Sequence, residues 1–262
     1  MPTVFGVLRV RNEVMWIRRV LYAMLPVCER IFLLDDHSTD CTPEVARDVS
    51  EKVTVYHSPF EGLDESRDKG WLLDRINGFI SEDYLNGDPR SPYWVLALDG
   101  DEELQVGGAD IIRQTIADTD KHCFSVQIKY FWDGTNRVRV DGVYRNFCRP
   151  SLFRLMNRNF KFLKTPFGNG ANFHCSSVPQ ELLAGFGHAP VKVWHYGYMI
   201  QDHRRRKYDW YNTIDPNNGH EDFYQHIIQG DPEGPNPGFK LKHAGPLEFE
   251  DTDADYAQEL HG

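Results

Sequence analysis

The segment WVLALDGDEE, residues 94–103, gives the clearest indication of the fold. Its first half, Trp94 to Leu98, is a short unbroken apolar run, which is typical of a central strand buried on both faces. The run ends in four acids among five residues. Because open α/β sheets bind ligands at the C-terminal ends of their strands, the sequence predicts a site at this point.

Asp99 and Asp101 place two carboxylates two residues apart, with the flexible Gly100 between them. Such a pair is able to hold a hard divalent cation. Magnesium or manganese keeps most of its own water and takes one or two protein carboxylates together with substrate phosphate oxygens. The alternative is an acidic turn that caps the helix after it, and the triplet alone does not decide between the two.

Strands and helices alternate along the first hundred residues. Apolar runs predict strands at residues 3–10, 31–34, 53–56 and 94–98. Helical spacing of apolar residues, with Asn12 and Thr42 as expected N-caps, predicts helices over residues 13–25, 43–49 and 71–80. This order predicts an α/β fold with a mostly parallel, doubly wound sheet.

The second half of the chain has a different pattern. Strands are predicted at residues 124–132, 149–155, 160–163 and 191–194, with little helix signal between 118 and 201. Helices are predicted at 202–213 and 221–229. Because no linker separates the halves, we expect a mixed extension of one sheet in a single domain, residues 1–230. Residues 231–262, rich in Pro and Gly and acidic near the end, are expected to form an extended, partly mobile tail.

Charge and cysteine content narrow the class of protein. Lysine and arginine number 29 against 39 aspartates and glutamates, a net charge of −10. This disfavours nucleic acid as a partner. The five cysteines are widely spaced without a Cys-x-x-Cys pair, which indicates neither a zinc site nor a disulfide framework.

No apolar run approaches the roughly 20 residues needed to span a bilayer. The N-terminal residues enter a strand pattern at once, without a cleavable signal. We therefore expect a soluble, cytoplasmic protein, and a peripheral membrane contact stays open.

Three motifs appear in order, each directly after a predicted strand: RNE at 11–13, LDDHSTDCT at 34–42 and LDGDE at 98–102. Together they resemble the family 2 glycosyltransferases, which have the GT-A fold and transfer a sugar from a nucleotide donor. SRD at 66–68 resembles the family's Ala-Arg-Asn element, with Asp68 where asparagine is usual. FHC at 173–175, VP at 178–179 and HYGY at 195–198 resemble a subgroup of small bacterial enzymes more loosely.

The resemblance implies a metal-dependent, inverting transfer from a UDP-like donor to a glycan or lipid-linked acceptor. Asp36 would accept from the N3–H of the base, Asp99 would touch the ribose or a metal-bound water, and Asp101 would bind Mn²⁺ or Mg²⁺. The implied donor-binding residues are Val10, Arg11, Asn12, Asp36, Arg67, Asp99, Gly100 and Arg204. The cation would neutralise charge on the departing diphosphate.

His195 matches a position where the wider fold often supplies a third metal ligand. A single histidine after a strand is as readily structural. Arg204 belongs to the basic run His203 to Lys207. That run is either a solvated helix face or a lid that closes over the diphosphate.

The general base has three candidates, Asp133, His174 and Glu181. An inverting transfer needs a carboxylate or histidine within reach of the acceptor hydroxyl. Related enzymes often have a His-Glu pair near this point, whereas here His174 is followed by Cys175.

Two alternatives remain from the sequence. A nucleotidyltransferase on a similar sheet would need a glycine-rich phosphate loop after the first strand, and Arg9 to Glu13 contains no glycine. A nucleotide-sugar-binding module without catalysis agrees with the missing His-Glu pair.

Overall fold

The computed structural model describes residues 2–164, 175–215 and 224–252. Two compact units form within them. The N-terminal unit comprises residues 2–127, 148–164 and 175–193, and the C-terminal unit comprises residues 128–147, 194–215 and 224–252. Among the described residues, the chain passes from one unit to the other within strand β6 (Cys123–Phe131), between Phe147 and Cys148, and within strand β11 (Gly187–His195).

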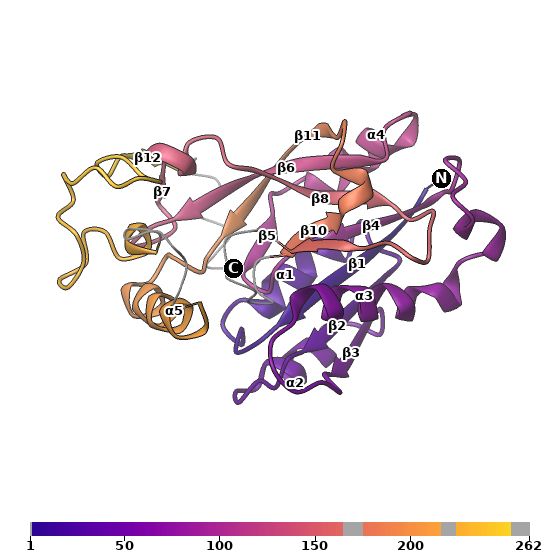
Figure 1. The fold of residues 1–262 in the computed structure, drawn as a ribbon, viewed down its shortest axis with the longest axis horizontal. Coiled ribbons are helices and arrows are strands. Elements are labelled where there is room, and N and C mark those ends of the chain that lie inside the picture. Colours follow the sequence, from indigo (N-terminus) through magenta and orange to yellow (C-terminus); the bar gives the residue numbers. More distant parts are fainter. Residues whose placement is uncertain (1, 165–174, 216–223, 253–262) are drawn as a thin grey trace. The chain divides into compact units, whose positions relative to one another are not determined.

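The N-terminal unit is built on a mainly parallel sheet (Figure 1). Its strand order is β6-β8-β4-β1-β2-β3. The parallel strands are β1 (Thr3–Val10), β2 (Arg30–Asp35), β3 (Val53–His57) and β4 (Tyr93–Ala97). The four agree with the predicted strands to within a residue or two, because continuous apolar runs are a clear signal for strands covered on both faces.

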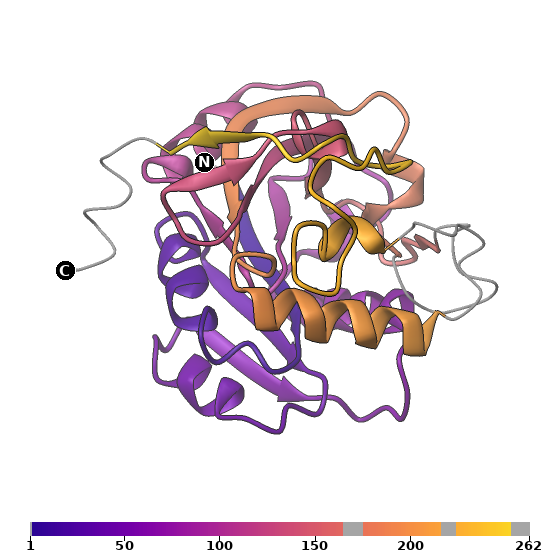
Figure 2. The same ribbon diagram turned by 90° about the vertical axis from the view of Figure 1, so that its left-hand side faces the viewer.

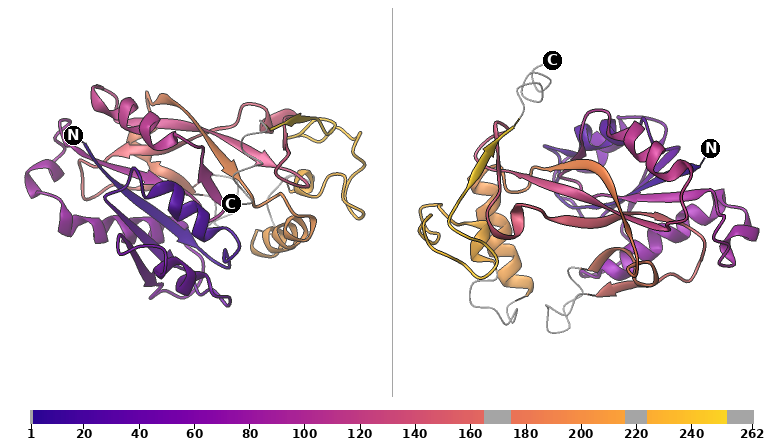
Figure 3. Two further views of the ribbon diagram at one scale, coloured as in Figure 1. Left: turned by 180° about the vertical axis from the view of Figure 1, so that it is seen from behind. Right: turned by 90° about the horizontal axis from the view of Figure 1, so that it is seen from above.

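Helices cover both faces of this sheet (Figure 3). Phe5 and Val7 point toward α3 (Glu65–Ile76), with which they share a buried apolar cluster. Gly6 lies on the opposite face, where a Cβ atom would come within 2.8 Å of Met24 in α1 (Ile17–Met24). The predicted α/β class is therefore confirmed.

Two predicted helix starts are wrong. We expected a helix from Glu13 capped by Asn12, but α1 begins at Ile17 and has no side-chain cap. We expected Thr42 to be the N-cap of the next helix, but α2 (Thr42–Arg47) includes it, and the residue before it, Cys41, is the N-cap. Asn12 and Thr42 instead bond to other loop residues.

The acidic stretch runs directly into a strand, β5 (Glu102–Leu104), which contains its last two acids. Helix α4 (Gly108–Ala117) follows where no helix was predicted, and Gly107 is its N-cap. The acids at 99–103 therefore do not cap a helix, and that alternative is wrong.

The predicted mixed extension is confirmed. Strand β8 (Cys148–Arg154) runs antiparallel to both β4 and β6. Strand β11 pairs with β5 and β6. A separate pair, β9 (Phe162–Lys164) and β10 (Cys175–Pro179), is antiparallel and lies against α3 (Figure 1).

The C-terminal unit contains the end of β6, then β7 (Arg137–Arg139) and β12 (Phe249–Asp251), each antiparallel to its neighbour. Its helix is α5 (Gln201–Ile214), close to the predicted range. Where a helix was predicted over 221–229, the described part is a single 3₁₀ turn, Gln225–Ile227, so the α-helix expected there is wrong for those residues.

Part of the expected tail has defined structure. Leu241 and Ala244 are buried against Tyr144, and β12 pairs with β7. The domain boundary at residue 230 and the mobility of the segment beyond it stay predictions. Among the residues that the structure covers, no helix has the length and apolar character needed to cross a membrane.

Candidate functional site

Hydrogen bonds between motif residues join the loop after β1 to the loop after β2. Asn12, in the left-handed region with φ 58°, donates its backbone N–H to Ser38 Oγ at 2.9 Å. Its side-chain Oδ1 accepts from the Thr39 N–H at 2.7 Å. Thr42 Oγ1 accepts from the Glu13 N–H at 2.8 Å. The polar residues of these two motifs thus fix the backbone at the sheet edge, which is a structural reason for their presence.

An ion-pair cluster joins β1, the end of β2 and α3. Arg9 reaches Asp36 Oδ2 at 2.5 Å through Nη2 and Asp68 Oδ2 at 2.8 Å through Nε. Arg11, nearly half exposed, lies 4.0 Å from Asp36. Asp36 and Asp68 are buried. The paired guanidinium groups compensate for removing these carboxylates from water.

Arg67 lies in the first turn of α3. Asp64 caps this helix by accepting the Arg67 backbone N–H at 3.0 Å. The Arg67 guanidinium donates to Asp68 Oδ1 at 2.8 Å and covers the Phe60 ring at 4.3 Å. Asp68 is therefore held by Arg67 on one oxygen and by Arg9 on the other. These two contacts explain why an aspartate stands at this position, where the family that the sequence resembles usually has asparagine.

The acids after β4 form a tight turn. The Glu102 N–H donates to the Asp99 carbonyl at 3.1 Å, which closes the turn over Gly100 and Asp101. Asp101 is buried, whereas half of the Asp99 side chain is exposed. A Cβ atom at Gly100 would lie 2.8 Å from Glu13 Cγ and 2.9 Å from Val10 Cγ1. Gly100 therefore allows this turn to pack on the end of β1.

Arg149, in β8, binds two of these acids at once. It donates to Asp99 Oδ2 at 2.9 Å and to Glu102 Oε2. Glu102 Oε2 also accepts the Asp99 backbone N–H at 3.0 Å. The loop is thereby tied to the antiparallel neighbour of β4.

The carboxyl groups of this turn differ in their acidity. Desolvation raises the pKa of Glu102 to about 7, and the nearby Asp99 and Asp101 charges act in the same direction against Arg149. For Asp99, desolvation opposes ionisation, but the Arg149 and Lys69 charges outweigh it and lower its pKa. Asp99 is consequently the more acidic of the two carboxyl groups.

Lys69 adds a cation to the site that sequence reasoning did not identify. Its Nζ lies 3.5 Å from Glu65 Oε2 and donates to the carbonyls of Cys175 and Ser176 at 3.5 and 3.4 Å. Burial works against protonation, but Glu65 and Asp99 raise the pKa of Lys69 above its ordinary value. Lys69 is therefore a positive group at this edge.

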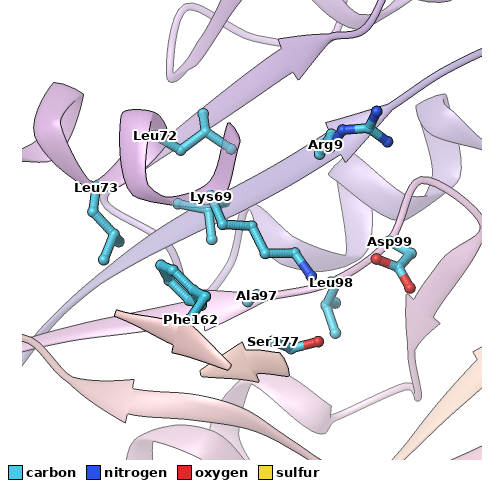
Figure 4. A pocket seen from close by; sticks show the side chains of 10 residues that line it. Arg9, Lys69, Leu72, Leu73, Ala97, Leu98, Asp99, Phe162 and Ser177 are labelled. Atoms are coloured by element: carbon cyan, nitrogen blue, oxygen red, sulfur yellow. The ribbon is translucent and has the colours of Figure 1, made fainter. Parts of the chain in front are cut away.

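Arg9, Lys69 and Asp99 line one small cavity of about 20 Å³ (Figure 4). That volume corresponds to about one water molecule. Leu72, Leu73 and Phe162 line its apolar part. Charged groups from β1, α3 and the turn after β4 thus meet around one space, as expected for the carboxyl ends of neighbouring parallel strands.

Asp99 and Asp101 supply some of the ligands of a hard divalent cation, but not a complete set. Within residues 2–164, 175–215 and 224–252, no three His, Cys, Asp or Glu side chains are grouped as a metal site. Two carboxylates on one turn still match the donors that Mg²⁺ or Mn²⁺ requires when phosphate oxygens and water complete its shell. These residues therefore fit a cation that binds together with a phosphate-containing ligand.

The C-terminal unit holds three of the predicted site residues. His195 ends β11 and lies against Tyr130 and Tyr198, with ring centroids 4.7 and 4.8 Å away. Arg204 is buried and donates to Asp133 Oδ1 at 2.8 Å. The other oxygen of Asp133 accepts from Arg137 at 2.6 Å. Asp133 thus binds two guanidinium groups at once. The ligand role of His195 stays a prediction.

The remaining base candidates are less defined. Glu181 is exposed in the 3₁₀ turn after β10 and accepts the Lys161 N–H at 3.5 Å. His174 lies outside the described residues.

Sequence reasoning missed Lys69 and Arg149 as site residues. Lys69 directly follows the SRD element, and Arg149 lies in a strand assigned only by its apolar neighbours. A search for basic residues beside the SRD element would have found Lys69. Arg149 reaches Asp99 across 50 residues of sequence, and only the antiparallel pairing of β8 with β4 brings it there.

Comparison with known proteins gives a distant relative. No family model matches the chain. An uncharacterized glycosyltransferase of Rickettsia bellii (strain RML369-C) is 24% identical over 162 residues. The match covers 62% of this chain and 46% of the relative, so the chain spans less than half of that protein.

Two solved structures are distantly similar to this chain. TarS from S. aureus, residues 1–349, is 12% identical with a TM-score of 0.43, and the match covers 86% of this chain and 69% of that one. Glucosyl-3-phosphoglycerate synthase from Mycobacterium tuberculosis, solved with Mn²⁺, UDP and glucosyl-3-phosphoglycerate, is 20% identical with a TM-score of 0.32. That match covers 51% of this chain and 45% of the other.

Proposed function

We propose that the protein is a glycosyltransferase of the GT-A type and of family 2, which transfers a sugar from a UDP-linked donor to an acceptor hydroxyl with inversion. The observation that carries the proposal is the set of charged residues at the ends of β1, β2 and β4. The three ordered motifs and the relative named as a glycosyltransferase support it.

Each part of the site has a role in this proposal. Asp36 and Arg67 receive the base, and Asp99 receives the ribose or a bound water. Asp101 holds Mn²⁺ or Mg²⁺. When bound, the cation neutralises charge on the leaving diphosphate. Lys69 adds a protonated amine beside the same cavity, whereas the charge of Arg9 is already balanced by Asp36 and Asp68.

The proposed contact of Asp36 with the base has to be compatible with the ion pairs that Asp36 makes. Its Oδ2 is bound by Arg9 and lies near Arg11. A carboxylate has room for about four hydrogen bonds over its two oxygens, so Asp36 is still able to accept from a base. Arg9 and Arg11 would orient it.

The proposal is tested by calorimetry of UDP with and without Mn²⁺. We expect tight binding only with the cation. Asp101→Asn should abolish the metal-dependent part, because it removes a charged oxygen ligand while keeping the side-chain shape. A matched control is Asp110→Asn, which removes an exposed carboxylate from α4 and should leave UDP affinity unchanged.

Equal UDP affinity with and without Mn²⁺, or equal effects of the two variants, would contradict the site. Sugar transfer is then measured separately. Slow hydrolysis of UDP-sugars that depends on Mn²⁺ and on Asp101 would support a catalyst.

One observation favours a second candidate, a nucleotide-sugar-binding module without catalysis. Of the three base candidates, Asp133 already accepts hydrogen bonds from Arg137 and Arg204 on its two oxygens. These contacts occupy the oxygens that a general base would use. Binding of UDP-sugars without hydrolysis or transfer under any metal condition would favour this module over the enzyme.

A further inference from the structure

A second binding feature lies wholly within the C-terminal unit. A groove of about 380 Å³ opens between α5, residues 225–228 and the segment 233–239. Figure 2 shows α5 in orange with the later, gold segment folded beside it. The volume falls within the range of about 300–1,000 Å³ of small-molecule sites.

The groove is lined by aromatic and neutral polar side chains. Tyr208 extends from α5, and Phe239 lies in the opposite segment with 59% of its surface exposed. The amides of Gln225 and Asn236 also line it. Among its described lining residues the charged side chain is an acid, Glu233. This arrangement offers donors and acceptors to hydroxyl groups.

The walls of the groove are fixed before any ligand binds. Arg204 donates to both oxygens of Asp231, at 3.0 and 2.5 Å, and so joins α5 to the segment opposite. Gln229, fully buried, donates to the Phe239 carbonyl at 2.7 Å. Arg139 in turn holds Gln229 at 2.5 Å. Tyr208 and Phe239 are therefore presented from anchored backbone, which lowers the entropic cost of binding.

Gly234 allows one wall of the groove to pack closely against the other. A Cβ atom there would lie 1.7 Å from the Ile228 carbonyl oxygen, so the segment approaches the end of the 3₁₀ turn at a distance that only glycine permits. Arg205 of α5 pairs with Glu233 at 2.5 Å and with Asp209 at 3.2 Å. Glu233, the acid that lines the groove, and Arg205 thus balance each other's charge.

We propose that this groove binds a neutral saccharide, the sugar portion of the acceptor. The C–H faces of a pyranose pack on aromatic rings, and its hydroxyls bond to amides and carboxylates; both kinds of group line this groove. The acceptor role rests on the proposed glycosyltransferase function, whereas saccharide binding itself does not.

The test uses the full chain and methyl glycosides of glucose, galactose, mannose and N-acetylglucosamine as probes. Saturation-transfer NMR identifies which of them binds, and a titration gives its Kd. Phe239→Ala should weaken that binding by about tenfold, because it removes one of the stacking faces. Phe239→Tyr, which keeps the ring, should retain it.

The control is Phe186→Ala, which removes an exposed phenylalanine from the N-terminal unit. It should leave the glycoside Kd unchanged. UDP binding with Mn²⁺ is measured on the same samples and should be equal in all of them.

The outcomes separate the two proposals. If no glycoside binds, or if Phe239→Ala binds as tightly as the control, the groove is not a saccharide site. Displacement of the glycoside by UDP would also overturn the inference. If UDP does not bind but a Phe239-dependent glycoside does, the saccharide site stands and the proposed donor function falls.

Discussion

Asp68 has no exposed side-chain surface and is held by two arginines from different elements. At the scale of the residue, this single position differs from the motif that the chain resembles. Asparagine would offer one oxygen and no charge, whereas aspartate accepts from Arg9 and Arg67 on separate oxygens. The contact with Arg9 also fixes the group that binds Asp36.

Asp68→Ala should lower the free energy of unfolding by about 1–3 kcal/mol, because Arg67 loses its carboxylate partner and Arg9 keeps only its ion pair with Asp36. Asp68→Asn should lower it less, since the amide oxygen still accepts one hydrogen bond. Urea denaturation followed by circular dichroism measures both. Asp74→Asn, an exposed carboxylate on the same helix, is the control and should change stability by no more than about 0.5 kcal/mol. Equal losses for the alanine variant and this control would show that the cluster is not structural.

The acids of the site were predictable from sequence, and their partners were not. Asp36, Asp99 and Asp101 follow apolar runs, so their place at a sheet edge follows from strand pattern alone. Lys69 and Arg149 acquire their roles through contacts between distant segments. Such contacts depend on helix docking and antiparallel pairing, which have no local signal.

At the scale of the element, strands were predicted better than helix ends. β1 and β4 are continuous apolar runs and agree with prediction almost residue for residue. The first helix begins four residues later than expected, at Ile17 instead of Glu13. Asn12 bonds to Thr39 instead of capping that helix, so a tertiary contact replaced the local preference.

Helix α5 shows the same limit of local reasoning. Its basic run was interpreted as a solvated face or a lid, yet Arg204 is buried and covers the Trp132 ring at 4.4 Å. Arg204 also joins α5 to Asp231 through a hydrogen bond. The neighbouring Arg206 is exposed. One basic residue of the run is therefore buried and ion-paired, which the composition of the run alone does not reveal.

Arg204→Met should lower the free energy of unfolding by about 3–5 kcal/mol, because Asp231 keeps a largely buried charge without its partner. Arg206→Met is the control and should change it by no more than about 0.5 kcal/mol. If Arg204 instead served the donor, UDP affinity would fall while the urea midpoint stayed constant. Urea denaturation and UDP calorimetry on the same variant distinguish these outcomes.

For the whole molecule, the reactivity of the cysteines measures whether the N-terminal unit is folded. All five lie in the N-terminal unit. Cys41 and Cys148 are exposed, whereas burial raises the pKa of Cys28, Cys123 and Cys175 to about 12. The thiolate is the reactive form, so the last three should react slowly in the native protein.

Ellman's reagent at pH 8 should therefore titrate Cys41 and Cys148 quickly, the partly buried Cys175 more slowly, and the buried Cys28 and Cys123 only as the N-terminal unit unfolds. Cys41→Ser and Cys148→Ser should each remove one fast thiol. This distinguishes the two exposed positions from the buried set. Five fast thiols in the native protein would contradict the packing of β1, α1 and β6.

The slow thiols also test whether the units unfold together. Strands β6 and β11 each contribute residues to both units, so neither unit keeps its full set of strands when the other unfolds. We expect one cooperative transition. Arg204→Met acts within the C-terminal unit, yet it should shift the urea midpoint of slow-thiol exposure by as much as it shifts circular dichroism. A thiol midpoint that stays at the wild-type value while the dichroism midpoint falls would show two independently folding units.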